Sequence, residues 1–451
     1  MNNIKRSIFK AYDIRGLVPE DFDANAAYHI ARAFVSIAGC KTCVIAHDMR
    51  LTGEELAGAL VSGCIDQGCD VYDIGLSSTP LYYYAVNRLE AEGGIMVTAS
   101  HNPKEYNGMK IVLKGAVPAV GVIDNDVLWR CAEESAYGEP AKNGNRLPVD
   151  VDLPDGYADL VLKTADLYDI KGLRLAVDCG NGMGGITLDP LLSKLANEPE
   201  RLYWRPDGSF PNHAANPLNE DTLLMLKETV VDKKCDLGVA YDGDADRVGF
   251  VDEKGNVVPG DFITALIGCS MLQDAPGKTI MYDLRSSWSV RDAITESGGV
   301  AKMCRVGHGP IKTQMRAEGG YFAGELSSHY YFSNFFVTDN GDLALLYILK
   351  LMLSTGKPLS ELAAPLRRYH KTKEINSKVA DTGAVLKRLE EIYTPQAKAT
   401  YHLDGFSAEF DDWWFNVRAS NTEPLIRLNL EARTPALMKE KSEELIGVIR
   451  S

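Results

Sequence analysis

The sequence predicts an α/β protein built from three related units, followed by a smaller α+β unit at the C-terminus. Three observations lead to this expectation. The chain has 451 residues, which is enough for about three or four domains that each bury a core. One plan recurs three times along the chain, and roughly the last 80 residues follow a different pattern.

The recurring plan is an apolar strand that ends in an acidic residue and leads through a loop into a helix. The predicted strands span residues 42–48, 173–178 and 279–283. A second strand follows in each unit and ends in chemically capable residues, within IMVTASHNP, LGVAYDGDADR and YFAGELSSH. Ligands bind beyond the carboxyl ends of strands in open α/β sheets, so these three loops are predicted to form a site.

The C-terminal unit is predicted from strands at 413–417 and 426–431 and from a closing helix that begins at Pro435. The apolar run at 343–353 is too short to span a bilayer and predicts a buried helix. Polar stretches near 138–155, 255–260 and 364–372 mark the unit boundaries. We therefore expect domains at residues 1–150, 151–256, 257–367 and 368–451.

The composition is that of a folded globular protein, with 45% hydrophobic and 24% charged residues. A formal net charge of −14 at pH 7 argues against general binding to nucleic acid or to an acidic membrane surface. The N-terminal segment lacks the apolar core of a signal peptide. We therefore expect a cytoplasmic protein with neither nucleic-acid nor membrane partners.

The nine cysteines are an odd number scattered along a large chain, which favours reduced thiols. Cys40 and Cys43 form a single CxxC upstream of Cys64 and Cys69, an arrangement that allows a zinc or redox site. No second CxxC is present and Cys43 begins an apolar strand, so ordinary core packing is the favoured interpretation.

The hexapeptide DGDADR places Asp242, Asp244 and Asp246 at every second position. In an extended segment these side chains point to one side. Their charges repel one another and raise their pKa values unless a cation lies among them, which predicts a hard metal such as Mg²⁺. An EF-hand loop is disfavoured because its sixth position holds Arg247 and its flanks resemble strands. A solvated acidic turn remains the simplest alternative.

Three further motifs carry candidate chemistry. Ser100 follows an apolar strand within TASHNP, where its hydroxyl can be phosphorylated or can attack, although a turn-capping serine fits as well. Glu325, Ser327 and His329 alternate within GELSSH and suit neighbouring sugar hydroxyls, although a structural turn is the simpler interpretation. The segment RASNTEPLIR offers hydrogen-bond donors for binding a phosphate, through Arg418, Ser420, Asn421, Thr422 and Arg427. An exposed polar hairpin is the alternative interpretation.

Taken together, YDIRG at 12–16, TASHNP, DGDADR, GELSSH and RASNTEPLIR resemble the α-D-phosphohexomutase family, and most closely its bacterial phosphomannomutase/phosphoglucomutase branch. The resemblance runs nearly end to end and keeps the motifs in order. It implies four domains around a central cleft, three with mixed α/β sheets and a smaller C-terminal α+β domain. Each domain would contribute one loop to the cleft.

The resemblance also implies residue roles. Ser100 would carry a phosphoryl group and, with Asp242, Asp244 and Asp246, would hold Mg²⁺. Glu325 and Ser327 would bind the sugar, and the loop from Arg418 to Thr422, with Arg427, would bind the phosphate already on the substrate. The cleft would also contain Arg15, Lys110, Arg247, Arg285, His308 and His329, and we expect Lys110 with His308 or His329 to shuttle protons.

Three positions depart from the family pattern. Ala245 and Ser328 stand where glycine is frequent, and these small replacements should leave the loops intact. Arg285 stands where lysine is common. Since a guanidinium does not deprotonate, Arg285 is expected to act electrostatically rather than as a base.

The expected reaction interconverts hexose 1-phosphate and hexose 6-phosphate, with hexose 1,6-bisphosphate as intermediate and primer. Contacts to O3 and O4 should accept glucose and mannose, which differ at C2. A phosphoglucosamine mutase is the nearest alternative. A serine-dependent metallophosphatase and a non-catalytic sugar-phosphate sensor are more distant ones. The sequence is silent on whether the protein is a monomer or a dimer.

Overall fold

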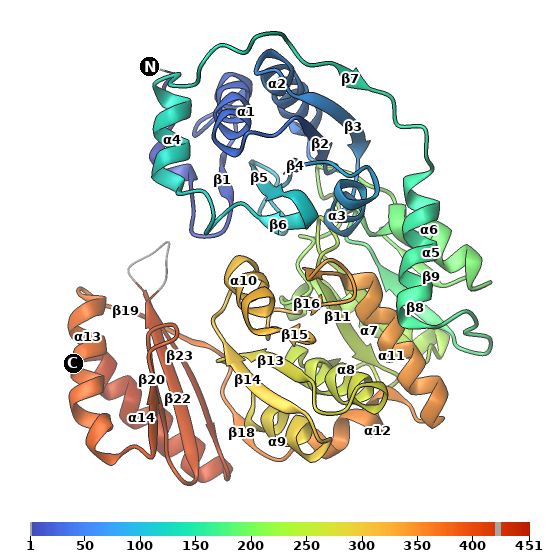
Figure 1. The fold of residues 1–451 in the computed structure, drawn as a ribbon. Helices are drawn as coiled ribbons and strands as arrows, with labels where there is room; N and C mark the ends of the chain where they lie inside the picture. Colours follow the sequence, from blue (N-terminus) through green and yellow to red (C-terminus); the bar gives the residue numbers. More distant parts are fainter. Residues whose placement is uncertain (1, 420–424) are drawn as a thin grey trace.

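The computed structural model describes residues 2–419 and 425–451, and these residues form four sheets flanked by helices (Figure 1). The first sheet has the order β1-β5-β4-β2-β3-β7, with β6 paired to β5. Its strands are β1 Ile14–Leu17, β2 Thr42–His47, β3 Asp70–Leu76, β4 Gly93–Val97, β5 Tyr106–Leu113, β6 Val117–Pro118 and β7 Arg146–Leu147.

The second sheet has the order β12-β11-β10-β8-β9, and the third has the order β14-β13-β15-β16-β17. Strands of the second sheet are β8 Leu175–Asp178, β9 Glu200–Leu202, β10 Leu237–Tyr241, β11 Val248–Asp252 and β12 Val257–Val258. Strands of the third sheet are β13 Thr279–Asp283, β14 Val300–Cys304, β15 Phe322–Gly324, β16 Tyr330–Phe332 and β17 Thr338–Asp339.

These three sheets share one central topology. In each, two neighbouring strands are parallel, namely β2 with β4, β8 with β10 and β13 with β15. The chain then turns back into an antiparallel strand, β5, β11 or β16. The three predicted loops are these turns, at the carboxyl ends of β4, β10 and β15. The expected α/β fold with mixed sheets is therefore confirmed.

Helices cover the sheets and begin where side chains can cap them. Asp23, Ser78 and Asn340 each accept a backbone N–H in the first turn of the helix that follows. The helices of the first three units are α1 Ala24–Ala38, α2 Gly53–Asp66, α3 Thr79–Arg88, α4 Asn125–Glu133, α5 Leu153–Ala165, α6 Gly184–Lys194, α7 Leu224–Lys233, α8 Gly260–Asp274, α9 Trp288–Glu296, α10 His308–Glu318, α11 Gly341–Thr355 and α12 Leu359–Ala363.

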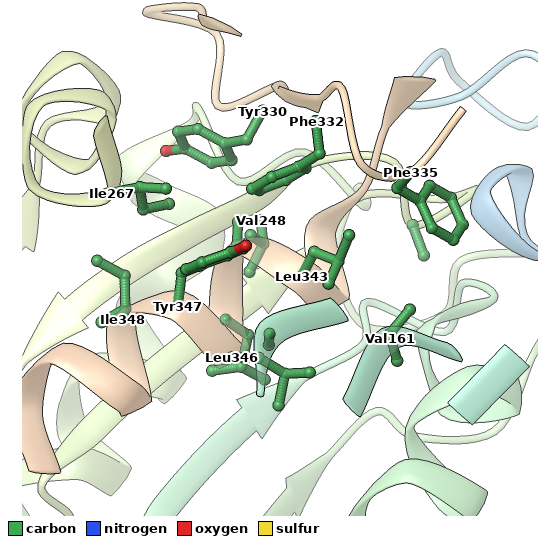
Figure 2. Close-up of a cluster of buried hydrophobic side chains, with 14 of the residues drawn as sticks. Val161, Val248, Ile267, Tyr330, Phe332, Phe335, Leu343, Leu346, Tyr347 and Ile348 are labelled. Carbon is green, nitrogen blue, oxygen red and sulfur yellow. The ribbon is translucent and has the colours of Figure 1, made fainter. Parts of the chain in front are cut away.

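Helix α11 joins the cores of the second and third units, as Figure 2 shows. It is the buried helix that the apolar run at 343–353 predicted, and Leu346 is fully buried on it. The same cluster contains Val161 of α5, Val248 of β11 and Ile267 of α8. Truncation of a buried leucine to alanine costs about 2–5 kcal/mol, so this helix strongly stabilises the arrangement of the two sheets.

The C-terminal sheet is antiparallel, in the order β18-β23-β22-β21-β20, with β19 also paired to β23. Its strands are β18 His370–Lys371, β19 Ile375–Lys378, β20 Ala399–Tyr401, β21 Phe406–Glu409, β22 Trp413–Ala419 and β23 Leu425–Ala432. Helices α13 Thr382–Tyr393 and α14 Pro435–Arg450 pack on it around a separate core (Figure 1). This is the expected small α+β unit.

A buried carboxylate joins this unit to the third sheet's helices. Glu431 of β23 accepts the backbone N–H of Trp288 at 2.8 Å and the indole N–H of Trp414 at 2.9 Å. Because Trp288 begins α9, Glu431 caps a helix of the neighbouring unit. Burial raises the pKa of Glu431.

The second sheet extends to Val258 because β12 pairs with β11. We therefore propose a boundary after Val258 instead of after residue 256, and we keep the other two boundaries as proposals. None of the helices within 2–419 and 425–451 combines the length and the apolar character that crossing a membrane requires.

Candidate active site

Ser100 lies in the turn after β4, and its backbone adopts the left-handed conformation with φ 50°. The turn is held locally, since the Ser100 N–H donates to Thr98 Oγ1 at 2.9 Å. The Ser100 hydroxyl donates to Asp242 Oδ2 at 2.8 Å, and Arg247 Nη2 lies 3.4 Å from the same hydroxyl oxygen. The serine predicted from the first unit therefore lies beside the acidic loop of the second.

The acidic trio is buried, and one carboxylate oxygen from each residue lies within 4.8 Å of those from the other two. The sequence predicted this convergence from an extended segment, and that reason is wrong. Strand β10 ends at Tyr241, and residues 242–247 form a turn in which Ala245 has φ 61°. The turn itself brings the three side chains together. Its left-handed residue also explains why glycine suits position 245.

The glycine between the first two aspartates allows the two loops to touch. A Cβ atom on Gly243 would lie 2.4 Å from the carbonyl oxygen of Ser100, well inside van der Waals contact. The acidic loop is also held within its own unit, because the Met183 N–H donates to the Gly243 carbonyl at 2.8 Å. Glycine at 243 is therefore required by a close approach between the serine loop and the acidic loop.

Lys110 of β5 supplies positive charge to the trio from the first unit. Its Nζ lies 2.6 Å from Asp244 Oδ2 and also contacts Asp246. Burial opposes the charge of Lys110, but Asp244 and Asp246 outweigh burial and raise the pKa of this lysine above its usual value. Lys110 is therefore an ammonium in this arrangement.

The trio fits a divalent cation in two respects. Within the described residues, Asp244 Oδ1 is buried without a hydrogen-bond donor, and Asp246 Oδ1 has only a long contact, 3.5 Å, to His329 Nε2. Burial, followed by repulsion from Asp246 and Asp244, raises the pKa of Asp242 to about 7. A Mg²⁺ ion prefers such carboxylate oxygens and would satisfy the uncompensated acceptors.

The predicted sugar loop is also a turn rather than an extended segment. The Glu325 N–H donates to the His329 carbonyl at 2.9 Å, and Ser328 has φ 65°. Glu325 accepts the Gly307 N–H and the Tyr331 hydroxyl, both at 2.7 Å. Despite burial, contacts with His329 lower the pKa of Glu325 to about 2, so this group is a carboxylate. Ser327, by contrast, is only partly buried.

His329 connects the sugar loop to the acidic loop. Its Nε2 lies 3.1 Å from Arg247 Nε, and its Nδ1 lies 3.3 Å from Glu325 Oε2. Burial and Arg247 lower the pKa of His329, but Asp246 and Glu325 outweigh them and raise it to about 9. His329 also forms, with Asp246 and Asp339, a second buried group whose side chains could hold a metal ion.

His308 begins α10, and both of its ring nitrogens are buried without a partner among the described residues. Burial and the neighbouring Lys312 and Lys110 hold the pKa of His308 well below its usual value. The imidazole is therefore neutral, and it has a nitrogen available to accept a proton.

Two further predicted arginines lie beside these loops, Arg15 on β1 and Arg285 just after β13. Arg15 Nη1 donates to Asn102 Oδ1 at 2.9 Å, which places it beside the serine turn. Arg285 Nη2 donates to Asp283 Oδ2 at 2.7 Å and lies 3.9 Å from Glu325 Oε1. Burial opposes the charge of Arg285, but Asp283 and Glu325 raise its pKa, so it remains a cation.

In the C-terminal unit, Arg418 and Arg427 share one carboxylate that sequence analysis missed. Glu374 accepts from Arg418 Nη2 at 3.1 Å and from Arg427 Nη1 at 3.2 Å. Both guanidinium groups keep a buried Nε without a partner among the described residues. The predicted residues Ser420, Asn421 and Thr422 lie outside the part of the chain that the structure describes.

The acidic residues at the ends of β2, β8 and β13, the first strands of the recurring plan, have a common role. Asp48, Asp178 and Asp283 each accept the N–H two residues ahead, at 3.0, 2.7 and 2.7 Å. The other carboxylate oxygen of each contacts a cationic or titratable side chain, respectively from Arg50, His213 and Arg285. The recurring acid was visible in the sequence, but its partner was not.

Comparison with known proteins gives one consistent result. Family models described as phosphoglucomutase/phosphomannomutase match in order, with alpha/beta/alpha domain I at residues 6–137, domain II at 155–255, domain III at 259–369 and the C-terminal domain at 374–448. A phosphomannomutase of Salmonella montevideo is 37% identical over an alignment of 461 positions, covering 100% of both chains. A phosphomannomutase of Escherichia coli K12 is 36% identical, covering 99% of both chains. A phosphoglucomutase/phosphomannomutase family protein of Burkholderia thailandensis superposes with a TM-score of 0.90 at 30% identity, covering 99% of this chain and 97% of that one.

Proposed function

The chain belongs to the phosphoglucomutase/phosphomannomutase family, and from this premise we propose that Ser100 carries the phosphoryl group that is transferred when hexose 1-phosphate and hexose 6-phosphate are interconverted. The chain is a hexose-phosphate mutase. The observation that carries the assignment to Ser100 is its hydroxyl, which lies 2.8 Å from Asp242 within the buried acidic trio.

The reaction proceeds in two phosphoryl transfers. The free hydroxyl of the bound hexose phosphate attacks phosphorus, so that its new O–P bond forms as the bond from Ser100 Oγ breaks. The product of this half-reaction is a hexose 1,6-bisphosphate. After the sugar has reversed its orientation, Ser100 receives the other phosphoryl group, and the isomeric monophosphate leaves. Such transfers depend mainly on alignment and on neutralisation of charge.

Asp242, Asp244 and Asp246 would hold Mg²⁺ together with the phosphoryl group on Ser100. When bound, this ion supplies charge neutralisation to the transferring phosphoryl group. Lys110 contributes a fixed positive charge from β5 because it contacts two of the three aspartates. Arg247 is placed to stabilise negative charge on Ser100 Oγ, from which its Nη2 lies 3.4 Å away.

We assign the proton transfer to His308. A base must take the proton of the attacking hydroxyl while a proton reaches Ser100 Oγ as it leaves, and in the second half-reaction Ser100 gives up its proton while the leaving sugar oxygen takes one. His308 is neutral and has unpartnered ring nitrogens within the described residues. Lys110 and His329 are held protonated by neighbouring carboxylates, so they act as cations rather than as the first acceptor.

The sugar is read by the third unit and its distal phosphate by the fourth. Glu325 is the acceptor for sugar hydroxyls and Ser327 supplies a partly exposed hydroxyl beside it. Arg285 lies 3.9 Å from Glu325 of this loop, and Arg418 and Arg427 offer guanidinium groups to the distal phosphate. Glu374 holds the two arginines in place before the phosphate arrives.

We propose mannose and glucose phosphates as substrates, with mannose supported by the phosphomannomutase relatives from Salmonella montevideo and Escherichia coli. The test follows conversion of the 1-phosphates of mannose, glucose and glucosamine to the 6-phosphates, with Mg²⁺ and a hexose 1,6-bisphosphate primer or without them. Isomerisation of mannose or glucose phosphate without release of inorganic phosphate supports the proposal. Turnover confined to glucosamine phosphate, or release of free phosphate, would contradict it.

A further inference from the structure

Arg50 lies in the loop after β2, and its guanidinium is directed at the backbone of the Ser100 turn. Nη2 donates to the carbonyl oxygens of Ser100 at 2.9 Å and Asn102 at 2.7 Å. Nη1 donates to the carbonyl oxygens of Pro103 and Tyr106, both at 2.8 Å. The four N–H groups at the end of one side chain therefore bind four carbonyls spread over residues 100–106.

The guanidinium is itself fixed on its remaining sides. Its Nε lies 3.3 Å from Asp48 Oδ2, and Asp48 Oδ1 accepts the Arg50 N–H at 3.0 Å. The ring of Phe210, from the second unit, covers the guanidinium at 5.4 Å between Cζ and the ring centroid. Arg50 is 3% exposed, so these contacts are made out of water, where hydrogen bonds to a charged group are strong.

We propose that Arg50 is the positioning residue of the phosphoserine turn: it holds Ser100 in register with Asp242 and thereby sets the rate of phosphoryl transfer. This inference rests on the proposed function of Ser100. The Ser100 carbonyl is held on one side by Arg50 and faces Gly243 of the acidic loop on the other, where a Cβ would lie 2.4 Å away. A shift of this carbonyl therefore moves the serine relative to the trio.

The left-handed backbone of Ser100 explains why the turn needs the contacts from Arg50, which we call the Arg50 clamp. A non-glycine residue with φ 50° is strained, and such strain persists only where surrounding contacts over-determine the conformation. Local bonds within the turn are few, with Asn102 N–H donating to Ala99 O and Tyr106 N–H to Pro103 O, both at 3.0 Å. Arg50 supplies four non-local contacts to the backbone carbonyls of the turn.

Only arginine has the shape for this task. A guanidinium is planar and carries five N–H donors in a fixed fork, whereas an ammonium carries three donors on a single nitrogen. Arg50→Lys keeps the charge beside Asp48 but leaves carbonyls of the turn without donors. The third unit offers the counterpart, because Arg285 occupies the same place after Asp283 and lies beside Glu325 of the sugar loop.

The test compares Arg50→Lys with the wild type and with Arg316→Lys. Arg316 is a matched control because it also binds several backbone carbonyls, those of residues 115–116, 312 and 336–337, none of which belongs to the Ser100 turn. The first readout is amide hydrogen exchange of the peptide 98–108. The second is kcat per phosphorylatable site, measured beside KM for mannose 1-phosphate.

We expect Arg50→Lys to speed exchange in 98–108 and to lower kcat per site by about 10- to 100-fold, because a small misplacement of reacting groups is costly. KM should change by less than about twofold, since other units bind the sugar and its distal phosphate. Arg316→Lys should leave exchange in 98–108 and kcat per site unchanged. A general loss of folding would lower the fraction of phosphorylatable sites but not kcat per site.

Phe210→Ala is a milder second variant because it exposes the Arg50 guanidinium without removing it. Like Arg50→Lys, it should speed exchange in 98–108 and lower kcat per site, with effects that are several-fold smaller. Unchanged kcat per site in an active, folded Arg50→Lys or Phe210→Ala protein would overturn the inference alone. A wild-type protein without mutase activity would overturn the proposed function and the catalytic part of the inference with it, while the exchange data would still report the clamp.

Discussion

Ser100 and Asp242 are 142 positions apart in the chain, and the hydroxyl of the first donates to the carboxylate of the second at 2.8 Å. Each residue follows an equivalent strand of its own sheet, β4 parallel to β2 and β10 parallel to β8. The equivalent ends of two related sheets are thus turned toward each other. A phosphoryl group on this serine would enter the buried group of aspartates.

Replacement of Ser100 by alanine should abolish most turnover, because the phosphoryl carrier is lost while little volume changes. Conversion of mannose 1-phosphate to mannose 6-phosphate measures the loss, and intact mass after incubation with hexose 1,6-bisphosphate measures phosphorylation. Ser62→Ala, at an exposed position on α2, is the matched control and should keep both. Near-normal mutase activity of the Ser100 variant would refute the assignment.

Asp246→Asn should weaken Mg²⁺ binding by at least about tenfold, since one of three charged oxygen donors becomes a neutral amide. Calorimetric titration of the metal-stripped protein with Mg²⁺ checks this expectation. Asp412→Asn, which changes a carboxylate that is 63% exposed and pairs with Arg433, should bind Mg²⁺ like the wild type. Equal affinities of the two variants would contradict the metal assignment.

Mg²⁺ binding should release protons near neutral pH. Burial and the other aspartates raise the pKa of Asp242 to about 7 in the metal-free protein, and a metal ligand must be deprotonated. Affinity should therefore fall as the pH decreases below 7, by up to about tenfold per pH unit, and level off above it. Titrations at pH 6 in two buffers of different ionisation enthalpy count the protons released. A release of none at that pH is the contrary result.

Gly243→Ala should lower kcat by about tenfold or more and destabilise the fold by about 1–3 kcal/mol, because the new Cβ would lie 2.4 Å from the Ser100 carbonyl oxygen. Activity assays and chemical denaturation measure the two effects. The control is Gly58→Ala on α2, where a Cβ has no atom within 4 Å. That change should keep activity and stabilise the helix by up to about 1 kcal/mol.

Glu431→Gln should change how stability depends on pH. Burial raises the pKa of Glu431 in the folded protein above its unfolded value of about 4.3. The folded state therefore binds more protons, and the free energy of unfolding of the wild type decreases as the pH rises from about 4 through the folded pKa. Glutamine does not titrate, so the free energy of unfolding of the variant should rise relative to that of the wild type as the pH increases over that range.

Denaturation of both proteins at several pH values measures the difference between them. Glu443→Gln, at an exposed position on α14, is the control and should show a difference that is independent of pH. A constant difference for Glu431→Gln as well would show that Glu431 has the same pKa in the folded and unfolded states.

The loops that carry the chemistry were predictable from the sequence because their residue types are local information. An apolar strand followed by polar residues marks the end of a buried strand, and the recurrence of that plan indicated three related sheets. The mutase family was predicted from these motifs in their order and is confirmed by the comparisons. The roles of individual residues in the reaction stay predictions.

The local geometry of two loops was not predictable from spacing. Alternation places side chains at every second position on one side only while the chain stays extended, yet Ala245 and Ser328 turn their loops through the left-handed region. The three aspartates converge as predicted, but the cause is the turn and not an extended strand. Glu374 carries no motif at all, and only the pairing of β19 with β23 places it near Arg427.

The sequence by itself therefore determined which groups this protein can use: a serine, three aspartates, a glutamate and several arginines at strand ends. The tertiary structure alone decided which of them meet, which stay charged and which hold the others. The reason is physical, because composition and spacing act over a few residues, whereas a contact such as Arg50 with the carbonyls of 100–106 depends on how whole strands pack. A pKa likewise depends on burial and on neighbours that are distant in the chain.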